Sequence, residues 1–126
     1  MGYENIEQAG LQLEENFKKT VTELLVLQLL TERECFIGEL TELIFRRSGG
    51  RLSVVFPYAA VYRMLERCYL EEAPKRIAPD GRRRQYYRIT ENGRAYLNVL
   101  TTVYERMTKS VYEVMNTKER ERESHE

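Results

Sequence analysis

Apolar residues recur at three- and four-residue steps along the first half of the chain, which predicts amphipathic helices. In the first stretch the spacing passes through Leu13, Phe17, Val21, Leu24 and Leu27. Its segment 21–30 is apolar around most of the helix circumference, so we expect burial on several sides. The pattern leaves open whether residues 3–9 extend this helix or form a short separate one.

Two further helices follow the first. One covers residues 36–47, with Ile37, Leu40, Leu43 and Ile44 facing inward, and the Ser-Gly-Gly of 48–50 stops it. The other runs from Pro57 to Cys68, because proline suits the first turn of a helix. Its apolar side carries Val61, Met64 and Leu65.

Alternation with a period of two then replaces the helical period. Segments 69–77 and 82–89 are separated by Ala-Pro-Asp-Gly, and Asp-Gly is a strong turn signal, so a β-hairpin is predicted. Pro74 makes the first strand irregular or places it at an edge. In the second strand Tyr87 shares a face with Ile89 and should be core, whereas Tyr86 lies on the other face.

The last periodic segment is a long helix, 91–115, with Thr90 as its N-cap. Its apolar positions follow steps of three and four residues, which is a heptad seam. Such a helix is about 37 Å long, too long for so small a domain to cover. We therefore expect a second copy of the chain to cover the seam. The expected dimerisation residues are Leu97, Leu100, Tyr104, Met107, Val111 and Val114.

Three helices followed by a hairpin are typical of the winged helix-turn-helix, in which the third helix enters a DNA groove. The predicted fold class is thus mainly α with a two-stranded β wing, a winged helix-turn-helix plus a long C-terminal dimerisation helix. We expect a winged-helix DNA-binding domain with the N-terminal helix at 1–92 and the dimerisation helix at 93–116. A charged, frayed tail is expected at 117–126.

Charge is neutral overall but unevenly distributed. Residues 1–45 carry 3 basic and 9 acidic side chains, whereas residues 46–94 carry 12 basic and 5 acidic. A basic middle segment is typical of a surface that faces phosphates, although a solvated face has the same composition. The strongest concentration is Arg82, Arg83 and Arg84 beside the hairpin turn.

The amino-acid composition gives little support for a catalytic site or a metal site. The chain has one histidine, His125, and no glycine-rich phosphate loop, so we expect neither an enzyme nor a cofactor or metal. Cys35 and Cys68 are expected to be small buried hydrophobes, with a redox pair as the alternative. No leader or membrane-length apolar run is visible, so a cytoplasmic protein without membrane contact is expected.

Three segments resemble one protein family, the PadR-type transcriptional regulators of the short kind with a single C-terminal helix. Segment 81–97, GRRRQYYRITENGRAYL, resembles that family's wing signature. Segment 58–70, YAAVYRMLERCYL, resembles its recognition helix, and segment 22–30, TELLVLQLL, its first helix. The chain departs from the pattern at Ala59, where proline is usual, at Cys68, where glycine is usual, and at 36–40.

The resemblance implies a homodimeric repressor that binds double-stranded DNA at a pseudo-palindromic operator. Some members of this kind also bind flat aromatic compounds between the subunits, which makes a small aromatic effector a further implied partner, with Tyr104 and Met107 as its candidate contacts. The residues expected to contact DNA are Ser53, Tyr58, Arg63, Arg82, Arg83, Arg84 and Tyr86.

Other interpretations of these residues stay open on sequence alone. The three wing arginines could keep an edge strand soluble, and Tyr58 could anchor its helix to the domain. Arg63 could pair with Glu66 three residues on, and Tyr104 could serve packing alone. The alternative function is a winged helix that docks a protein and does not bind DNA. The wing arginines favour DNA, because a protein-docking wing more often presents a mixed or apolar surface.

Overall fold

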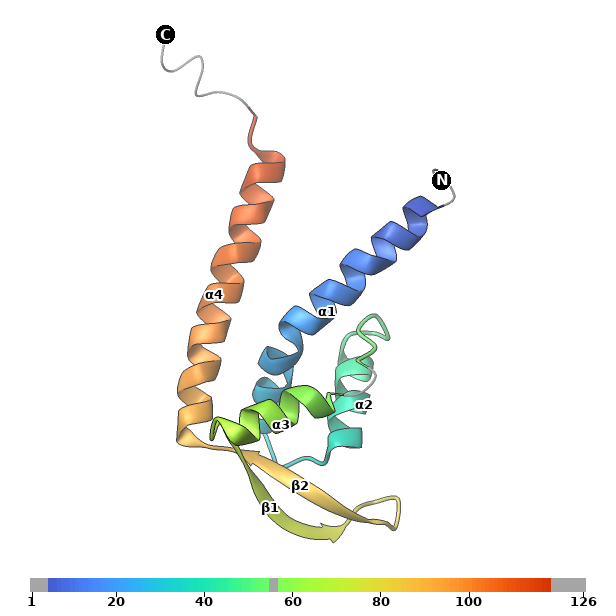
Figure 1. Cartoon of the computed structure of the whole chain (residues 1–126), viewed down its shortest axis with the longest axis vertical. Coiled ribbons are helices and arrows are strands. Elements are labelled where there is room, and N and C mark those ends of the chain that lie inside the picture. Colours follow the sequence, from blue (N-terminus) through green and yellow to red (C-terminus); the bar gives the residue numbers. More distant parts are fainter. Residues whose placement is uncertain (1–4, 55–56, 119–126) are drawn as a thin grey trace.

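The computed structural model describes residues 5–54 and 57–118. The elements in chain order are α1 (Ile6–Leu30), α2 (Ile37–Arg47), α3 (Tyr58–Glu66), β1 (Leu70–Ile77), β2 (Arg83–Ile89) and α4 (Glu91–Asn116). In Figure 1, α2, α3 and the hairpin gather at one end of the molecule, and the outer ends of α1 and α4 diverge from it as two arms. The predicted fold, a winged helix-turn-helix with a long C-terminal helix, is confirmed.

The start of α1 decides a question that the sequence left open, and the bounds of α3 differ from the predicted ones. α1 begins at Ile6, so residues 6–9 extend the first helix, whereas residues 3 and 4 lie outside the described part of the chain. α3 ends at Glu66 and is shorter than predicted, because Cys68 takes a left-handed φ of 63° that an α-helix cannot continue. α3 begins at Tyr58, one residue after the predicted start, and Pro57 is its N-cap.

One hydrophobic core joins the three N-terminal helices to β2 and to the first turns of α4. The inner half of α1 supplies most of it, and its predicted burial on several sides is confirmed. The best-buried large side chains are Val26, Leu27, Leu40, Val61 and Met64. Each comes from an apolar stripe with a helical period, so the sequence pattern and the core agree.

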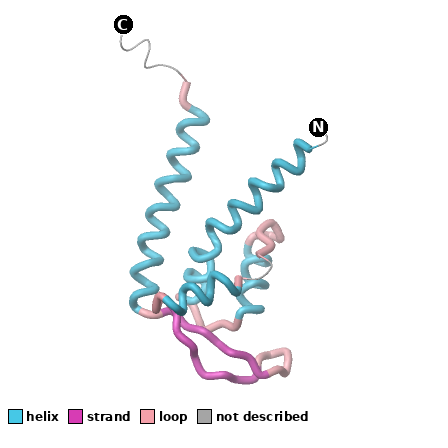
Figure 2. The backbone as a smooth tube through the Cα atoms, in the orientation of Figure 1, coloured by secondary structure: helices cyan, strands magenta, loops and turns pink. Residues whose placement is uncertain are grey.

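The hairpin pairs β1 with β2 in antiparallel register, from Leu70 opposite Ile89 to Ile77 opposite Arg83. The register shifts between Ala73 and Arg76, at the proline that the sequence marked as irregular. Gly81 turns the chain with a φ of 85°, as the Asp-Gly dipeptide predicts. The hairpin therefore extends past the helices as a wing, drawn in magenta in Figure 2.

Cys35 fixes the wing to the helices. Between α1 and α2 it exchanges two backbone hydrogen bonds with Tyr87 of β2, at 2.9 and 3.3 Å. Its side chain is fully buried, and burial, followed by the nearby charge of Glu39, raises the pKa of its thiol to about 11. The prediction of two buried thiols holds for Cys35 but is wrong for Cys68, which is exposed at the end of α3.

Thr90 caps α4 as predicted, since its Oγ1 accepts the backbone N–H of Gly93 at 3.0 Å. The same hydroxyl donates to the carbonyl of Cys68 at 2.7 Å, which ties the start of α4 to the end of α3. A Cβ at Gly93 would lie only 2.1 Å from the carbonyl oxygen of Tyr69. α4 can therefore pass this close to the beginning of β1 only because Gly93 has no side chain.

Candidate nucleic-acid interface

α3 turns one face to the core and the opposite face outward. Ala60, Val61 and Met64 are buried, whereas Tyr58 and Tyr62 are 44% and 54% exposed. The two tyrosine rings are neighbours one turn apart, with centroids 6.2 Å from each other. Tyr62 was not among the residues predicted to contact DNA, although its i+4 spacing from Tyr58 places it on the same face.

The tyrosine face of α3 adjoins the wing. Burial raises the pKa of the Tyr87 hydroxyl in β2, and the nearby Tyr62 and Tyr58 of α3 contribute to that rise. Ser53 is exposed in the segment that leads to α3, beside the exposed Arg51. The structure thus brings together the outer face of α3 and the hairpin, which the sequence separates. Ser53 instead lines a hollow on the α1 side of α3, with Lys18 and Arg63.

The wing arginines divide into paired and unpaired groups. Arg84 forms an ion pair with Asp80 at 2.5 Å, and this hydrogen bond is the main reason that the pKa of Asp80 is lowered. Arg82 and Arg83 are exposed, and no ion pair within the described part of the chain engages either of them. Of the three arginines predicted to contact DNA, Arg82 and Arg83 are thus the ones without an ion pair, whereas Arg84 is paired within its own turn.

Two further arginines of the wing, both exposed, are paired with acids. Arg76 pairs with Glu34 at 2.8 Å, and Arg88 pairs with Glu71 at 3.1 Å and with Glu34 at 3.5 Å. The hydrogen bond to Glu71 is the largest cause of the raised pKa of Arg88. These pairs neutralise Arg76 and Arg88, whereas Arg82 and Arg83 beside the turn keep their charge without an ion pair among the described residues.

Tyr86 is buried, and its predicted contact with DNA is wrong. Its exposure is 5%, because its ring packs edge-on against Phe36 at 5.5 Å and the Arg76 guanidinium covers it at 3.5 Å. Ala73 and Ala78 complete this small second core. The alternation of β2 correctly placed Tyr86 on the face opposite Tyr87, but Phe36 and Arg76 pack against that face as well. Tyr87 lies in the main core, as predicted.

The sequence predicts that Arg63 contacts DNA, with Glu66 of its own helix as the alternative partner. Its guanidinium contacts Glu23 of α1 at 2.6 Å, not Glu66 of its own helix. This ion pair directs the side chain toward α1, away from the tyrosine side of α3. We therefore leave Arg63 out of the candidate DNA contacts.

A second exposed feature is an apolar groove of about 600 Å³ between the outer halves of α1 and α4. One wall is α1, with Leu13 and Phe17 exposed by 71% and 42%. The other wall is α4, and its lining side chains include Leu100, Tyr104, Met107, Val111, Tyr112 and Met115. The sequence identified the α4 wall as a seam, but it did not show that α1 forms the second wall.

The seam residues differ in exposure along α4. Leu97 is 6% exposed within the domain's own core, so its assignment to a dimer interface is wrong. Leu100 packs partly against the same core. Exposure rises outward through Tyr104 (37%) and Met107 (53%) to Val114 (81%). The first turns of α4 therefore belong to the winged helix, and only the outer turns remain uncovered.

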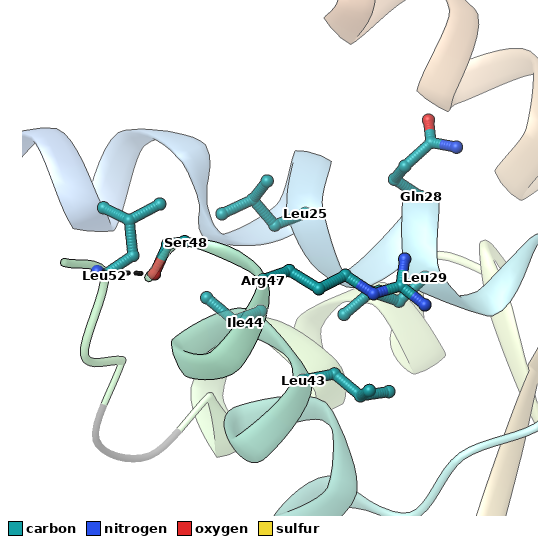
Figure 3. A pocket seen from close by; sticks show the side chains of 8 residues that line it. All are labelled: Leu25, Gln28, Leu29, Leu43, Ile44, Arg47, Ser48 and Leu52. Carbon is teal, nitrogen blue, oxygen red and sulfur yellow. Dashed lines mark hydrogen bonds between the residues drawn. The ribbon is translucent and has the colours of Figure 1, made fainter. Parts of the chain in front are cut away.

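A smaller hollow of about 280 Å³ lies between α1 and α2 (Figure 3). Leu25, Leu29 and Leu43 line it, and Ser48 closes one end by accepting the backbone N–H of Leu52 at 2.9 Å. The Arg47 guanidinium beside it is already occupied, because it forms two 2.8 Å hydrogen bonds with Glu32. This hollow is mainly apolar, and the side-chain amide of Gln28 is the other polar group that lines it.

Metal binding and membrane insertion find no support in the described residues. No three histidine, cysteine or acidic side chains there lie close enough to hold a metal ion. No described helix is both long enough and apolar enough to cross a bilayer.

Comparison with solved structures finds proteins of the same fold. The chain is similar to a PadR-like transcriptional regulator (BC4206) from Bacillus cereus, with 21% identity, a TM-score of 0.66 and coverage of 79% of this chain and 96% of that chain. It is also similar to a transcriptional regulator from Clostridium thermocellum, with 22% identity, a TM-score of 0.69 and coverage of 81% and 99%.

A PadR family transcription regulator from Clostridium difficile R20291 matches with 19% identity, a TM-score of 0.63 and coverage of 76% and 99%. No protein-family model and no curated protein matches the sequence. The solved structures show that the chain has the fold of PadR-like transcriptional regulators, as the sequence resemblance implied.

Proposed function

We propose that this protein is a DNA-binding transcriptional regulator of the PadR type that acts as a homodimer. The observation that carries the proposal is the selective pairing of the wing arginines. Arg76, Arg84 and Arg88 are held by acids of the same chain, whereas Arg82 and Arg83 project from the tip without such a partner among the described residues. Unpaired guanidinium groups beside an exposed helix face are suited to phosphate and groove contacts.

In this proposal α3 enters the major groove and the wing contacts the adjacent backbone. The candidate contacts are Ser53, Tyr58 and Tyr62 around α3, and Arg82 and Arg83 on the wing. Tyrosine and serine hydroxyl groups donate to phosphate oxygens, while the arginines add charge-assisted bonds.

The second copy of the chain would cover the groove between α1 and α4. A stable dimer buries about 800 Å² per partner, and the outer arms of α1 and α4 expose apolar side chains over their whole length. The sequence-based boundaries place a DNA-binding domain at 1–92, a dimerisation helix at 93–116 and a charged tail at 117–126. We propose the same division with one change, since Leu97 in the first turns of α4 packs in the core of the DNA-binding domain. A dimer would place two α3 helices on half-sites about 34–36 Å apart.

A repressor would act by occupying a pseudo-palindromic operator, and a flat aromatic effector is proposed to bind between the subunits. Tyr104 and Met107 both line the α1–α4 groove, which supports them as contacts for such a compound. An effector there would alter the angle between the arms and so the separation of the two α3 helices.

The direct test is selection of bound duplexes from a random pool. We expect enriched sequences with two inverted half-sites, separated by about one helical turn. Binding should weaken steeply between about 50 and 200 mM salt, because phosphate contacts release counterions. Failure to enrich any sequence, with affinity independent of salt, would favour the alternative winged helix that docks a protein.

Arg83→Ala should weaken binding to all duplexes by a similar factor and make the salt dependence shallower by about one unit of log–log slope. The reason is that Arg83 is expected to neutralise one phosphate without contacting a base. Fluorescence anisotropy over a salt series measures both quantities. Arg88→Ala is the matched control, since that guanidinium is paired with Glu71 and Glu34, and its slope should stay unchanged. Equal slopes for Arg83→Ala and the unmodified protein would remove Arg83 from the interface.

A further inference from the structure

Glu23 lies where α1, α3 and α4 meet, and its side chain is only 14% exposed. Its Oε1 accepts a hydrogen bond from the Tyr96 hydroxyl of α4 at 2.6 Å. Its Oε2 accepts one from Nε of Arg63 on α3 at 2.6 Å. A single carboxylate of α1 therefore bridges the long C-terminal helix and the helix that carries the tyrosine face.

Both partners of Glu23 are themselves held in place. The Tyr96 ring stacks on Tyr69 at the start of β1, with centroids 4.1 Å apart and an interplanar angle of 13°. Burial, followed by the hydrogen bond to Glu23, raises the pKa of Tyr96 to about 12. Charge-assisted hydrogen bonds with partly buried partners are among the stronger polar contacts in a protein.

The position of Glu23 along α1 connects this bridge to the apolar groove. Val21 and Leu24, on either side of Glu23 in sequence, line the inner end of the groove. Whatever fills the groove acts on the same turn of α1 that carries the carboxylate. A change in the angle between α1 and α4 would thus move Tyr96 relative to Glu23 and alter the support of Arg63.

We propose that Glu23 is a positioning residue for DNA recognition, which fixes the orientation of α3 relative to α4. The inference rests on the proposed function, because only a DNA-binding dimer makes use of a fixed α3. Glu23 itself does not touch DNA. Its effect is to hold two α3 helices at the separation that the operator half-sites require.

The test compares Glu23→Gln with Glu32→Gln. Each substitution removes one Arg–Glu ion pair, but the pair of Glu32 is with Arg47 of α2 and involves neither α3 nor α4. The first readout is the distance between spin labels on α3 and α4, introduced as Ala59→Cys and Lys109→Cys at exposed positions. The labelled chain is mixed with excess unlabelled chain, so that only distances within one chain are seen.

The labelling background carries Cys68→Gly, which suits the left-handed φ of 63° at that position. Cys35 remains unlabelled because it is fully buried and its thiol has a raised pKa. We expect a narrow distance distribution for the unmodified pair and for Glu32→Gln, and a broad one for Glu23→Gln. The second readout is the ratio of affinities for a selected operator and a random duplex, which should fall about tenfold for Glu23→Gln alone.

Tyr96→Phe provides a second variant that keeps the ion pair between Glu23 and Arg63 and removes only the bond to α4. Tyr96→Phe should also broaden the distribution of distances between the labels on α3 and α4. It keeps the inference testable if Glu23→Gln does not fold. Unchanged distances in Glu23→Gln, or equal broadening in Glu32→Gln, would overturn the inference. If the unmodified protein prefers no duplex, the proposed function fails, while the label distances still decide whether Glu23 positions α3.

Discussion

Replacing Gly93 by alanine should lower the free energy of unfolding by about 3 kcal/mol or prevent folding altogether. A Cβ at this position would lie 2.1 Å from the carbonyl oxygen of Tyr69 and 2.8 Å from Cγ1 of Ile89. The nearer atom belongs to the backbone, so it cannot move aside as the end of a flexible side chain can. That carbonyl also accepts the N–H of Thr90 at 3.1 Å, which anchors it further.

Urea denaturation followed by circular dichroism measures this effect. Gly10→Ala is the matched control, since it makes the same substitution inside α1, where no atom beyond the adjacent residues and the backbone of the helix itself lies within 4 Å of the added Cβ. That variant should gain up to about 1 kcal/mol, because alanine is the better helix former. Equal stabilities of Gly93→Ala and the unmodified protein would contradict the packing of α4 on β1.

Met107→Glu should raise the dissociation constant of the homodimer by at least about a hundredfold. Met107 is 53% exposed in the single chain and lines the α1–α4 groove, so the isolated chain should keep its fold. In a dimer the same position would be covered, and a carboxylate without a partner would be buried there. Operator affinity should fall in parallel, because a monomer engages only one half-site.

Analytical ultracentrifugation gives the association state, and anisotropy gives the DNA affinity. Thr102→Glu adds the same charge to the same helix at an exposed position that does not line the groove, so it should leave the dimer intact. Leu100→Glu should also break the dimer, but Leu100 packs partly against the core of its own chain and the substitution destabilises the fold as well. An intact dimer for Met107→Glu would show that the groove is not the dimer interface.

Much of the fold could be predicted from local sequence features. The Asp-Gly dipeptide determined the hairpin turn, Thr90 the N-cap of α4, and the helical spacing of apolar residues the inner faces of α1, α2 and α3. These signals are local, since turn geometry, capping and amphipathicity depend on residues within a few positions of each other. The end of α3 was not predicted correctly, because Cys68 takes a left-handed φ of 63°, which the spacing of apolar residues does not indicate.

The candidate site was predicted less well than the fold. Arg82 and Arg83 remain candidates for DNA contact, whereas Arg84 is paired, Tyr86 is covered and Arg63 faces α1. The charged residues and the period-two alternation of the sequence identified which side chains project from the hairpin. They could not identify which of those side chains meet another part of the same chain.

The sequence by itself determined the order of the elements, their apolar faces and the concentration of positive charge on the wing. Only the tertiary structure decided that Glu23 bridges Arg63 and Tyr96, partners 40 and 73 residues away, and that α1 and α4 together form one apolar groove. The physical reason is that periodicity reports which face of an element avoids water. The element that covers this face, and the acid that neutralises a given arginine, are chosen by packing between distant segments.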